Sequence, residues 1–274
     1  MFGGRGMRMF VVHLTTPCIM SDLQALLDQK FRQYNTPSFI DEDPIRIPHQ
    51  FARKADIEVA GFLAALIAWG QRTTILRNAQ ALMARMDLAP YDFVMQAGEA
   101  ELAQLEGFVH RTFNSLDARA LVLALRRVYA DHGGLEGIFS APISLRTPDV
   151  GPGIIHARTV LTAGPDFPAR THKHLANPAT GSSAKRLNMF LRWMVRRDGQ
   201  GVDFGLWRGI APRQLICPLD IHTGNVARKL GLLTRKQNDW KAALELTEAL
   251  RQFCPEDPVR YDFGLFGLGV YDKF

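Results

Sequence analysis

Residues 56–70 restrict the fold of this chain more than any other stretch. The segment DIEVAGFLAALIAWG has two acids in its first turn, ends in Gly70, and is apolar on nearly every side of a helical projection. Early acids and a final glycine are typical of the two ends of an α-helix. A helix that is apolar all round must be covered on all sides. The segment therefore predicts a buried central helix with other helices packed around it.

Helical periodicity continues through most of the chain, whereas alternating strand patterns are nearly absent. The predicted helices cover residues 21–34, 75–86, 90–97, 99–105, 116–131, 134–139, 183–197, 220–230, 239–253 and 257–269. Ser21 is expected to cap the first of them, and Ser182 or Ser183 the helix that ends near residue 197. Residues 141–169 are rich in Pro and Gly and predict an irregular crossing loop. The fold class that follows is all-α.

Basic charge is concentrated in the second half of the chain. The 274 residues have a formal net charge of +6, but residues 170–241 alone contain 14 Lys and Arg against four Asp. A local basic excess of this size suits a polyanion. Nucleic acid is favoured over an anionic membrane, because no basic amphipathic helix with a continuous apolar face is present. A solvated basic surface without a ligand is the alternative.

Residues 217–232 place a carboxylate at the start of a predicted short helix. Asp220 is a favourable N-cap, and Gly231 is suited to the position just after the helix. The periodic positions expected on its packed face are His222, Val226 and Leu230. Arg228 and Lys229 are expected to point outward. A plain capped helix explains this segment as well as a functional site does.

The same segment has the pattern D-x-H-x-x-x-V-x-x-K-L-G-L from Asp220 onward. This pattern resembles the D-T-H-V-x-R-V-x-x-R-L-G-L signature of helix-hairpin-helix DNA glycosylases of the endonuclease III type. The resemblance implies that Asp220 is the catalytic carboxylate at a helix N-terminus. It also implies nucleic-acid contacts by His222, Arg228 and Lys229. Asn225 departs from the family, which usually has Arg there for a phosphate contact.

A second segment, residues 58–74, is similar to the buried helix of the same superfamily. In that superfamily a Gln after the helix enters the duplex beside the target base. Gln71 is the matching residue here, and Arg72 next to it is expected to contact nucleic acid as well. A polar cap at a helix break is the alternative role for Gln71.

A third segment, residues 178–187, is similar to the L-P-G-V-G-x-K-T-A hairpin of the superfamily. That hairpin offers backbone N–H groups to a phosphate, and its Lys forms a Schiff base with the sugar C1′ in bifunctional members. The resemblance implies Lys185 as a second catalytic residue, or as a phosphate-binding lysine only. It places Gly181, Ser182 and Arg186 at the nucleic acid. The second glycine of the hairpin is missing here. The long Lys-to-Asp separation, and Lys185-Arg186-Leu187 with an apolar helix after it, look more like the archaeal 8-oxoguanine glycosylase branch.

These resemblances imply a helix-hairpin-helix glycosylase-like fold with a cleft between two helical lobes, roughly residues 20–170 and 171–274. The implied function is a DNA glycosylase, with or without AP-lyase activity, that excises a damaged base from double-stranded DNA. A non-catalytic nucleic-acid-binding protein on the same fold is the first alternative. A small-molecule enzyme that reuses the scaffold for an anionic substrate is the second. Residues 21–270 also resemble an uncharacterised bacterial family of unknown function.

Metal and disulfide chemistry are not expected. The cysteines, far apart and without metal-ligand spacing, are Cys18, Cys217 and Cys254. Three consecutive acids, Asp41, Glu42 and Asp43, lack the spacing of metal ligands. They predict a turn or an exposed loop rather than a metal site. We therefore expect no metal and no cofactor.

No apolar run approaches the roughly 20 residues that a membrane-spanning helix needs. Residues 1–19 are expected to be disordered or to be an artefact of the assigned start. Residues 20–274 are expected to form one two-lobed helical domain. The sequence thus predicts a cytoplasmic monomer.

Overall fold

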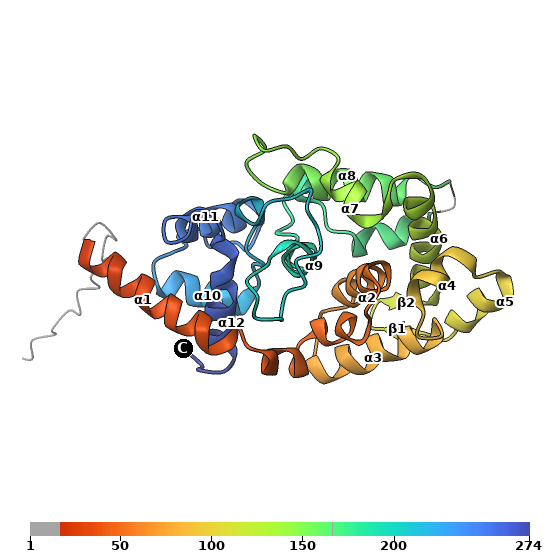
Figure 1. The fold of residues 1–274 in the computed structure, drawn as a ribbon, viewed down its shortest axis with the longest axis horizontal. Helices are drawn as coiled ribbons and strands as arrows, with labels where there is room; N and C mark the ends of the chain where they lie inside the picture. The colour runs from red at the N-terminus through yellow and green to blue at the C-terminus, as the bar shows by residue number, and fades with distance from the viewer. Residues whose placement is uncertain (1–16, 166) are drawn as a thin grey trace, which may run out of the picture.

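The computed structural model describes residues 17–165 and 167–274 (Figure 1). Within these residues the all-α prediction is confirmed, because the strands are limited to the antiparallel pair β1 (Val109–His110) and β2 (Phe113–Asn114). The prediction of disorder concerns residues 1–19, of which residues 1–16 lie outside the described residues. Helix α1 begins at Pro17, so Ser21 lies inside this helix and is not its cap.

The α-helices are joined by links of very different length, the longest of which are residues 35–53, 163–184 and 196–220. Their bounds are α1 Pro17–Tyr34, α2 Lys54–Leu66, α3 Arg72–Arg85, α4 Pro90–Gln96, α5 Glu99–Leu102, α6 Ser115–Asp131, α7 Gly134–Ser140, α8 Gly151–Thr162, α9 Lys185–Val195, α10 Ile221–Lys229, α11 Trp240–Arg251 and α12 Asp262–Val270. The 3₁₀ helices are η1 Pro37–Glu42, η2 Pro44–Arg46, η3 Pro48–Gln50, η4 Ala103–Leu105, η5 Ala169–His174, η6 Pro178–Thr180, η7 Pro212–Gln214 and η8 Pro258–Tyr261.

Helix α2 is the buried central helix that the sequence predicts. Its residues 57–66 are all buried, and it packs against α9. The two helices approach closely at Gly61, where a Cβ would lie 3.3 Å from the terminal carbon of Met194. The helix ends at Leu66 rather than at the expected Gly70. Trp69 and Gly70 instead form the link to α3, with Gly70 in a left-handed conformation at φ +105°.

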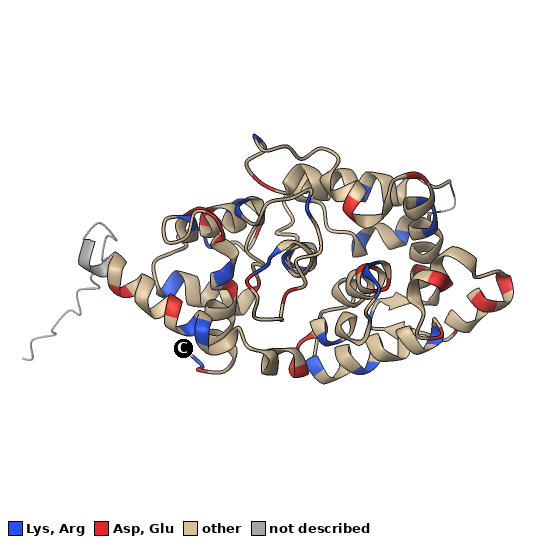
Figure 2. Cartoon of the chain, in the orientation of Figure 1, with Lys and Arg blue, Asp and Glu red and all other residues tan. Residues whose placement is uncertain are grey.

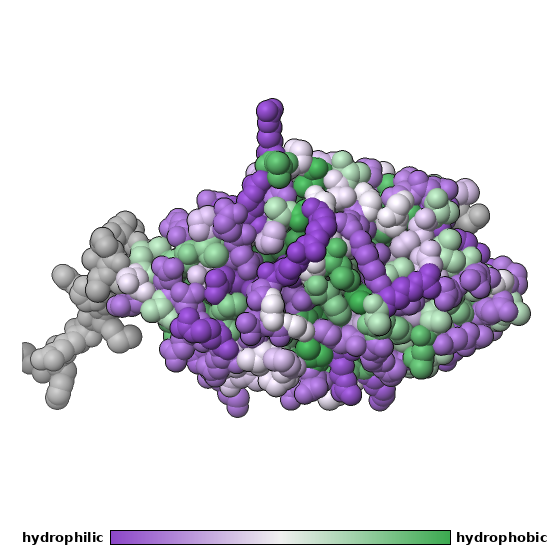
Figure 3. All heavy atoms as spheres, viewed as in Figure 1, coloured by the Kyte–Doolittle hydropathy of each residue, from purple (hydrophilic) through white to green (hydrophobic). Residues whose placement is uncertain are grey.

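Helix α9 lies between two groups of helices in Figure 1. On one side α1 and α10 pack against α12, and on the other lie α2 to α8 and the hairpin of β1 and β2, which contacts α3 and α6. Figure 3 shows apolar side chains near the centre of this face, bordered by hydrophilic ones. The start of α9 therefore lies where the N-terminal and C-terminal parts of the chain meet.

The prediction of an irregular loop over residues 141–169 is wrong in its middle part, because α8 occupies residues 151–162. The glycines that suggested a loop allow close packing instead. A Cβ on Gly153 would lie 2.3 Å from the carbonyl oxygen of Phe139, so only glycine fits where α8 crosses α7. Pro152 stands in the first turn of α8, where proline is tolerated.

Candidate functional site

Asp220 is the N-cap of α10, as the sequence predicts. Its Oδ1 accepts a hydrogen bond of 2.9 Å from the backbone N–H of Thr223. The other end of the helix is a Schellman motif, in which the N–H of Leu232 donates to Ala227 and that of Gly231 to Arg228. The cap fixes one carboxylate oxygen and leaves Oδ2 outside this hydrogen bond.

The predicted packed face of α10 is partly wrong. Val226 is buried and Leu230 is half-buried, but His222 is exposed to solvent. Helix α10 packs on α12. The buried residues in its first two turns are Thr223, Gly224, Val226 and Ala227, so the packed face begins one residue after His222. His222 remains available for an external partner.

Lys185 is the first residue of α9, and neither Ser182 nor Ser183 caps that helix. The N-cap is Ala184, a buried residue in a left-handed conformation at φ +49°. Ser182 Oγ instead accepts from the N–H of Ala184, at 3.2 Å. The prediction of a serine cap therefore fails because the chain turns sharply one residue before the helix.

The structure brings Lys185 and Asp220 together. Lys185 Nζ lies 3.8 Å from Asp220 Oδ2, and each side chain is about a quarter exposed, at 27% and 28%. Lys185 Nζ also lies 3.6 Å from the sulfur of Met189. An amine and a carboxylate from two helix N-termini thus share one partly solvated position, which is the arrangement that the catalytic assignment requires.

The pair stands at a narrow pocket between α9, α10, α12 and the η1–η2 segment. Its other lining residues are Phe39, Asp43, Met189, Arg192, Pro218, Thr223, Asp262 and Phe266. The pocket has a free volume of about 20 Å³, room for about one water molecule. A nucleobase can enter only if the walls move.

Two acids of this pocket were not identified from the sequence. Asp43, expected in a turn or an exposed loop, is buried and caps η2 by accepting from the N–H of Ile45 at 3.0 Å. Burial raises the pKa of the Asp43 carboxyl above its usual value. Burial likewise raises the pKa of Asp262, in α12, to about 6, although Arg192 opposes that shift. For Asp43 the sequence holds one local signal, the Asp43-Pro44 pair, because an Asp followed by Pro is typical of the start of a helix.

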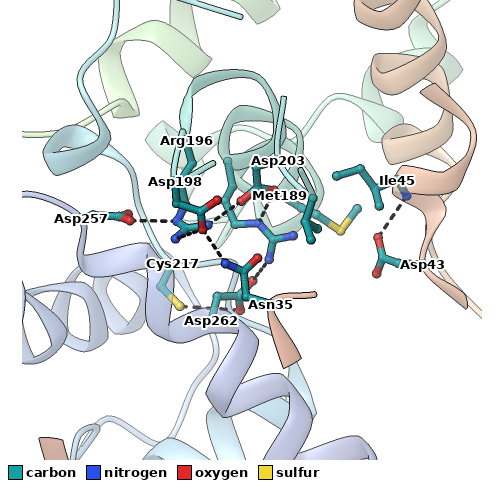
Figure 4. Close-up of polar contacts among 12 residues, drawn as sticks. Asn35, Asp43, Ile45, Met189, Arg196, Asp198, Asp203, Cys217, Asp257 and Asp262 are labelled. Carbon is teal, nitrogen blue, oxygen red and sulfur yellow. Dashed lines mark hydrogen bonds and ion pairs between the residues drawn. The ribbon is translucent and has the colours of Figure 1, made fainter. Parts of the chain in front are cut away.

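Asp262 belongs to a buried ionic network around α9 (Figure 4). Arg192 Nη1 donates to Asp262 Oδ2 at 2.6 Å, and Arg192 Nε donates to Asp203 at 3.2 Å. Arg196 pairs with the three carboxylates of Asp198, Asp203 and Asp257. Basic and acidic segments accordingly lie side by side near α9 in Figure 2. Part of the basic excess of residues 170–241 is therefore neutralised inside the protein.

Gln71 and Arg72 have different environments. Gln71 is exposed just before α3, and its side chain caps no helical N–H group. Arg72 Nη1 instead donates to the hydroxyl of Tyr271 at 3.1 Å, and its guanidinium lies 5.1 Å from the ring centre of Phe266. Arg72, which the sequence places at the nucleic acid, is thus engaged in contacts that join α3 to the end of α12.

Arg186 is held within the protein. Its Nη1 donates to the carbonyl oxygen of Leu66, and its guanidinium lies 4.6 Å from the ring centre of Trp69. Burial lowers the pKa of Arg186 to about 10. The residue connects the start of α9 to the end of α2, so the structure gives it a packing role where the sequence suggested a phosphate contact.

Arg228 also folds back onto the protein. Its guanidinium donates to the carbonyl oxygens of Arg235 and Lys236, both at 2.9 Å, and to Asn238 Oδ1 at 2.6 Å. Lys229 is exposed, with Nζ 5.5 Å from the ring centre of Phe274. Of the two cations expected to point outward, only Lys229 does so.

The Gly181–Ser182 turn is exposed, but its N–H groups are used locally. Gly181 N–H donates to Pro178 at 2.9 Å and Ser182 N–H donates to Asn177 at 3.3 Å. Gly181 has φ +90°, which accounts for glycine at this position. The carbonyl of Gly181 accepts from the N–H of Trp240 at 2.9 Å, so the turn packs on the start of α11. The expected pair of free N–H donors is not present here.

Other kinds of site have little support in residues 17–165 and 167–274. No group of three or more His, Cys, Asp or Glu side chains in this part of the chain is placed to hold a metal ion. None of its helices has the length and apolar character needed to cross a membrane. Cys217 and Cys254 are free thiols.

Comparison with curated proteins and with solved structures gives no match. A family described as a protein of unknown function, DUF2400, matches residues 43–271. The match extends from the buried Asp43 to the end of α12 and includes every lining residue of the pocket except Phe39. The chain therefore belongs to the DUF2400 family.

Proposed function

We propose that the protein is a DNA glycosylase that excises a damaged base, with Lys185 and Asp220 as its catalytic residues. The observation that supports this most is the 3.8 Å distance between Lys185 Nζ and Asp220 Oδ2. Excision needs a nucleophile at C1′ and a carboxylate that stabilises positive charge on the sugar. The two residues supply both groups on adjacent helix N-termini, in a two-lobed helical fold of the helix-hairpin-helix glycosylase type.

The proposed step starts with the neutral amine of Lys185. Nζ forms a bond to C1′ while the C1′–N glycosidic bond breaks, and the electron pair leaves with the base. A proton released from Nζ is accepted by Asp220 and passes to the departing base. The C1′–O4′ bond then opens as nitrogen forms a C=N double bond, and O4′ takes up a proton. The product is a Schiff base between Lys185 and the sugar.

The orientation of Asp220 fits its proposed role. Its Oδ1 is fixed by the N–H of Thr223, so Oδ2 is the oxygen that faces Lys185. Asp220 also lies at the N-terminus of α10, where the helix dipole attracts negative charge. A charged oxygen held in one place is suited to an oxocarbenium-like transition state, because it needs no reorganisation during the reaction.

The pocket beside the pair is the proposed base-binding position. Phe39 and Phe266 offer ring surfaces, and Asp43 and Asp262 offer carboxyl groups whose pKa is raised by burial. Since its free volume is about 20 Å³, base binding requires displacement of these walls. An extruded base and a moving wall are common features of enzymes that act on a base outside the stack.

A non-catalytic DNA-binding protein is the second candidate. Two observations favour it: the N–H groups of Gly181 and Ser182 are used within their own turn, and the pocket is closed. Under this proposal the exposed polar and basic residues, such as Gln71, His222 and Lys229, bind the duplex without chemistry.

The test is base release from a panel of duplexes that each contain one lesion, with an oxidised purine included. The wild-type protein is expected to release a base from at least one duplex, and Lys185→Gln and Asp220→Asn are expected to release none. Salt-sensitive binding without release from any duplex supports the second candidate. Absence of binding at about 50 mM salt rejects both.

A further inference from the structure

The hairpin of β1 and β2 has an unusual residue at its turn. His110 pairs with Phe113, so Arg111 and Thr112 form a two-residue turn, and Arg111 has φ +57°. Glycine, Asn or Asp is favoured at such positions because a side chain is strained in the left-handed region. Strain of this kind in a well-packed protein is found preferentially at functional positions.

The turn is braced by contacts at His110 in β1 and at Thr112 in the turn itself. His110 lies 3.0 Å from Asn78 Nδ2 and, through its Nε2, 3.1 Å from the carbonyl oxygen of Trp69. Arg170 Nη2 donates to the carbonyl oxygen of Thr112 at 3.0 Å. The strained backbone of Arg111 is therefore held by neighbouring elements.

The guanidinium of Arg111 lies across Gly70. Its Nη1 would be 2.9 Å from a Cβ on that residue, and the left-handed backbone of Gly70, at φ +105°, favours glycine there. Gln71, the residue expected to enter the duplex, follows directly. The exposed arginine is thereby placed beside the proposed DNA-facing end of α2.

Arg111 differs from the other cations around it. Arg170 pairs with the buried Asp117 at 3.3 Å, and Arg186 is engaged with Leu66 and Trp69. Arg111 forms no ion pair and no hydrogen bond within residues 17–165 and 167–274. A braced, strained and unpaired guanidinium at the surface is suited to an anion, and phosphate is the anion that arginine binds with the best geometry.

We propose that Arg111 binds a backbone phosphate of duplex DNA and so positions the duplex against Gln71. This inference rests on the proposed function, because it places one duplex against both Gln71 and the Lys185–Asp220 pair. It assigns to the hairpin a binding role that contributes to affinity for any duplex, since a phosphate contact conveys no base identity.

The test compares three variants of Arg111 with the full-length wild-type protein, using fluorescence anisotropy with an undamaged and a lesion-containing duplex. In Arg111→Gly the turn keeps its conformation without strain, so the variant is expected to melt at a higher temperature than wild type while binding DNA more weakly. The slope of log affinity against log salt is expected to fall by about one in Arg111→Gly and in Arg111→Gln. Arg111→Lys is expected to keep the slope.

Arg208→Gln is the matched control, because Arg208 is also exposed and its side chain forms no ion pair in the described part of the chain. Its salt slope should equal that of wild type. An unchanged slope in Arg111→Gly and Arg111→Gln, with base release intact, overturns the Arg111 inference alone. Loss of DNA binding by the wild-type protein overturns the proposed function with it. A slope that falls equally in Arg208→Gln also contradicts a specific contact.

Discussion

The amine of Lys185 lies 3.8 Å from the carboxylate of Asp220, and both residues stand at the N-terminus of a helix. This position suits Asp220, because the helix dipole favours an anion there, and it opposes Lys185 for the same reason. A partly exposed ion pair contributes little to stability. Under the proposed function, Lys185 occupies this position for its chemistry rather than for stability.

Removal of this pair should barely affect folding. For Lys185→Gln and for Asp220→Asn we expect the free energy of unfolding to change by no more than about 1 kcal/mol, because the pair is partly solvated and the Asn side chain still caps α10. Urea denaturation followed by circular dichroism measures this change. A loss above about 3 kcal/mol in Lys185→Gln would show that the lysine has a structural role.

Substitution of Arg228 should lower stability, whereas substitution of its neighbour Lys229 should weaken DNA binding. Arg228→Ala removes hydrogen bonds to two carbonyl oxygens and one amide oxygen, so we expect it to destabilise the protein by about 1–3 kcal/mol. Lys229→Ala should leave stability unchanged and reduce the salt slope of DNA binding by about one. Thermal melts and anisotropy titrations of both variants check this. The opposite pattern would mean that Arg228 leaves its carbonyl partners to reach a phosphate.

The raised pKa of Asp262 predicts a pH dependence of stability. Its pKa in the folded protein is about 6, against 3.8 as the ordinary value, because the carboxyl is buried. Between these two pH values the folded state binds more protons than the unfolded chain, so the contribution of Asp262 to stability decreases as the pH rises from about 4 to 6. The full decrease is on the order of 3 kcal/mol.

Denaturant titrations at several pH values measure this effect as the stability of wild type minus that of Asp262→Asn. This difference in unfolding free energy is expected to fall as the pH rises from about 4 to 6 and to stay constant above pH 6. A difference that is constant from pH 4 to 7 would show that Asp262 is ionised throughout, as a partner of Arg192.

Arg72 should control the opening of the pocket. Its guanidinium lies over Phe266, one of the pocket walls, and donates to Tyr271. Arg72→Ala removes both contacts, so we expect a loss of about 1 kcal/mol in stability and faster hydrogen exchange in α12. If base entry limits the rate, base release should also become faster. Unchanged exchange in α12 would contradict the assignment of Arg72 as a brace.

Local signals in the sequence predicted the helices well. The cap at Asp220 and the glycine at Gly231 depend on residues close in sequence, and both have the expected geometry. The error over residues 141–169 has a physical cause, because glycine at Gly153 serves close helix packing as well as it serves a loop. Composition alone does not distinguish these two uses.

The site was less predictable than the fold. Lys185 and Asp220 were selected by resemblance, whereas Asp43 and Asp262 enter the pocket only through the tertiary packing of η2 and α12. Long cationic side chains were the other source of error. Arg186 belongs to this group, since it occupies a sequence position typical of the surface while its guanidinium reaches a buried carbonyl.

In the proposed reaction Lys185 attacks the sugar, and borohydride trapping detects that bond. Sodium borohydride reduces a Schiff base to a stable amine, so the wild-type protein incubated with a duplex containing an oxidised purine should give a covalent protein–DNA adduct on a denaturing gel. Lys173→Gln, a control at an exposed lysine, should give the same adduct. Lys185→Gln should give none and should still bind the duplex. An adduct of undiminished yield in Lys185→Gln would contradict the assignment of the nucleophile.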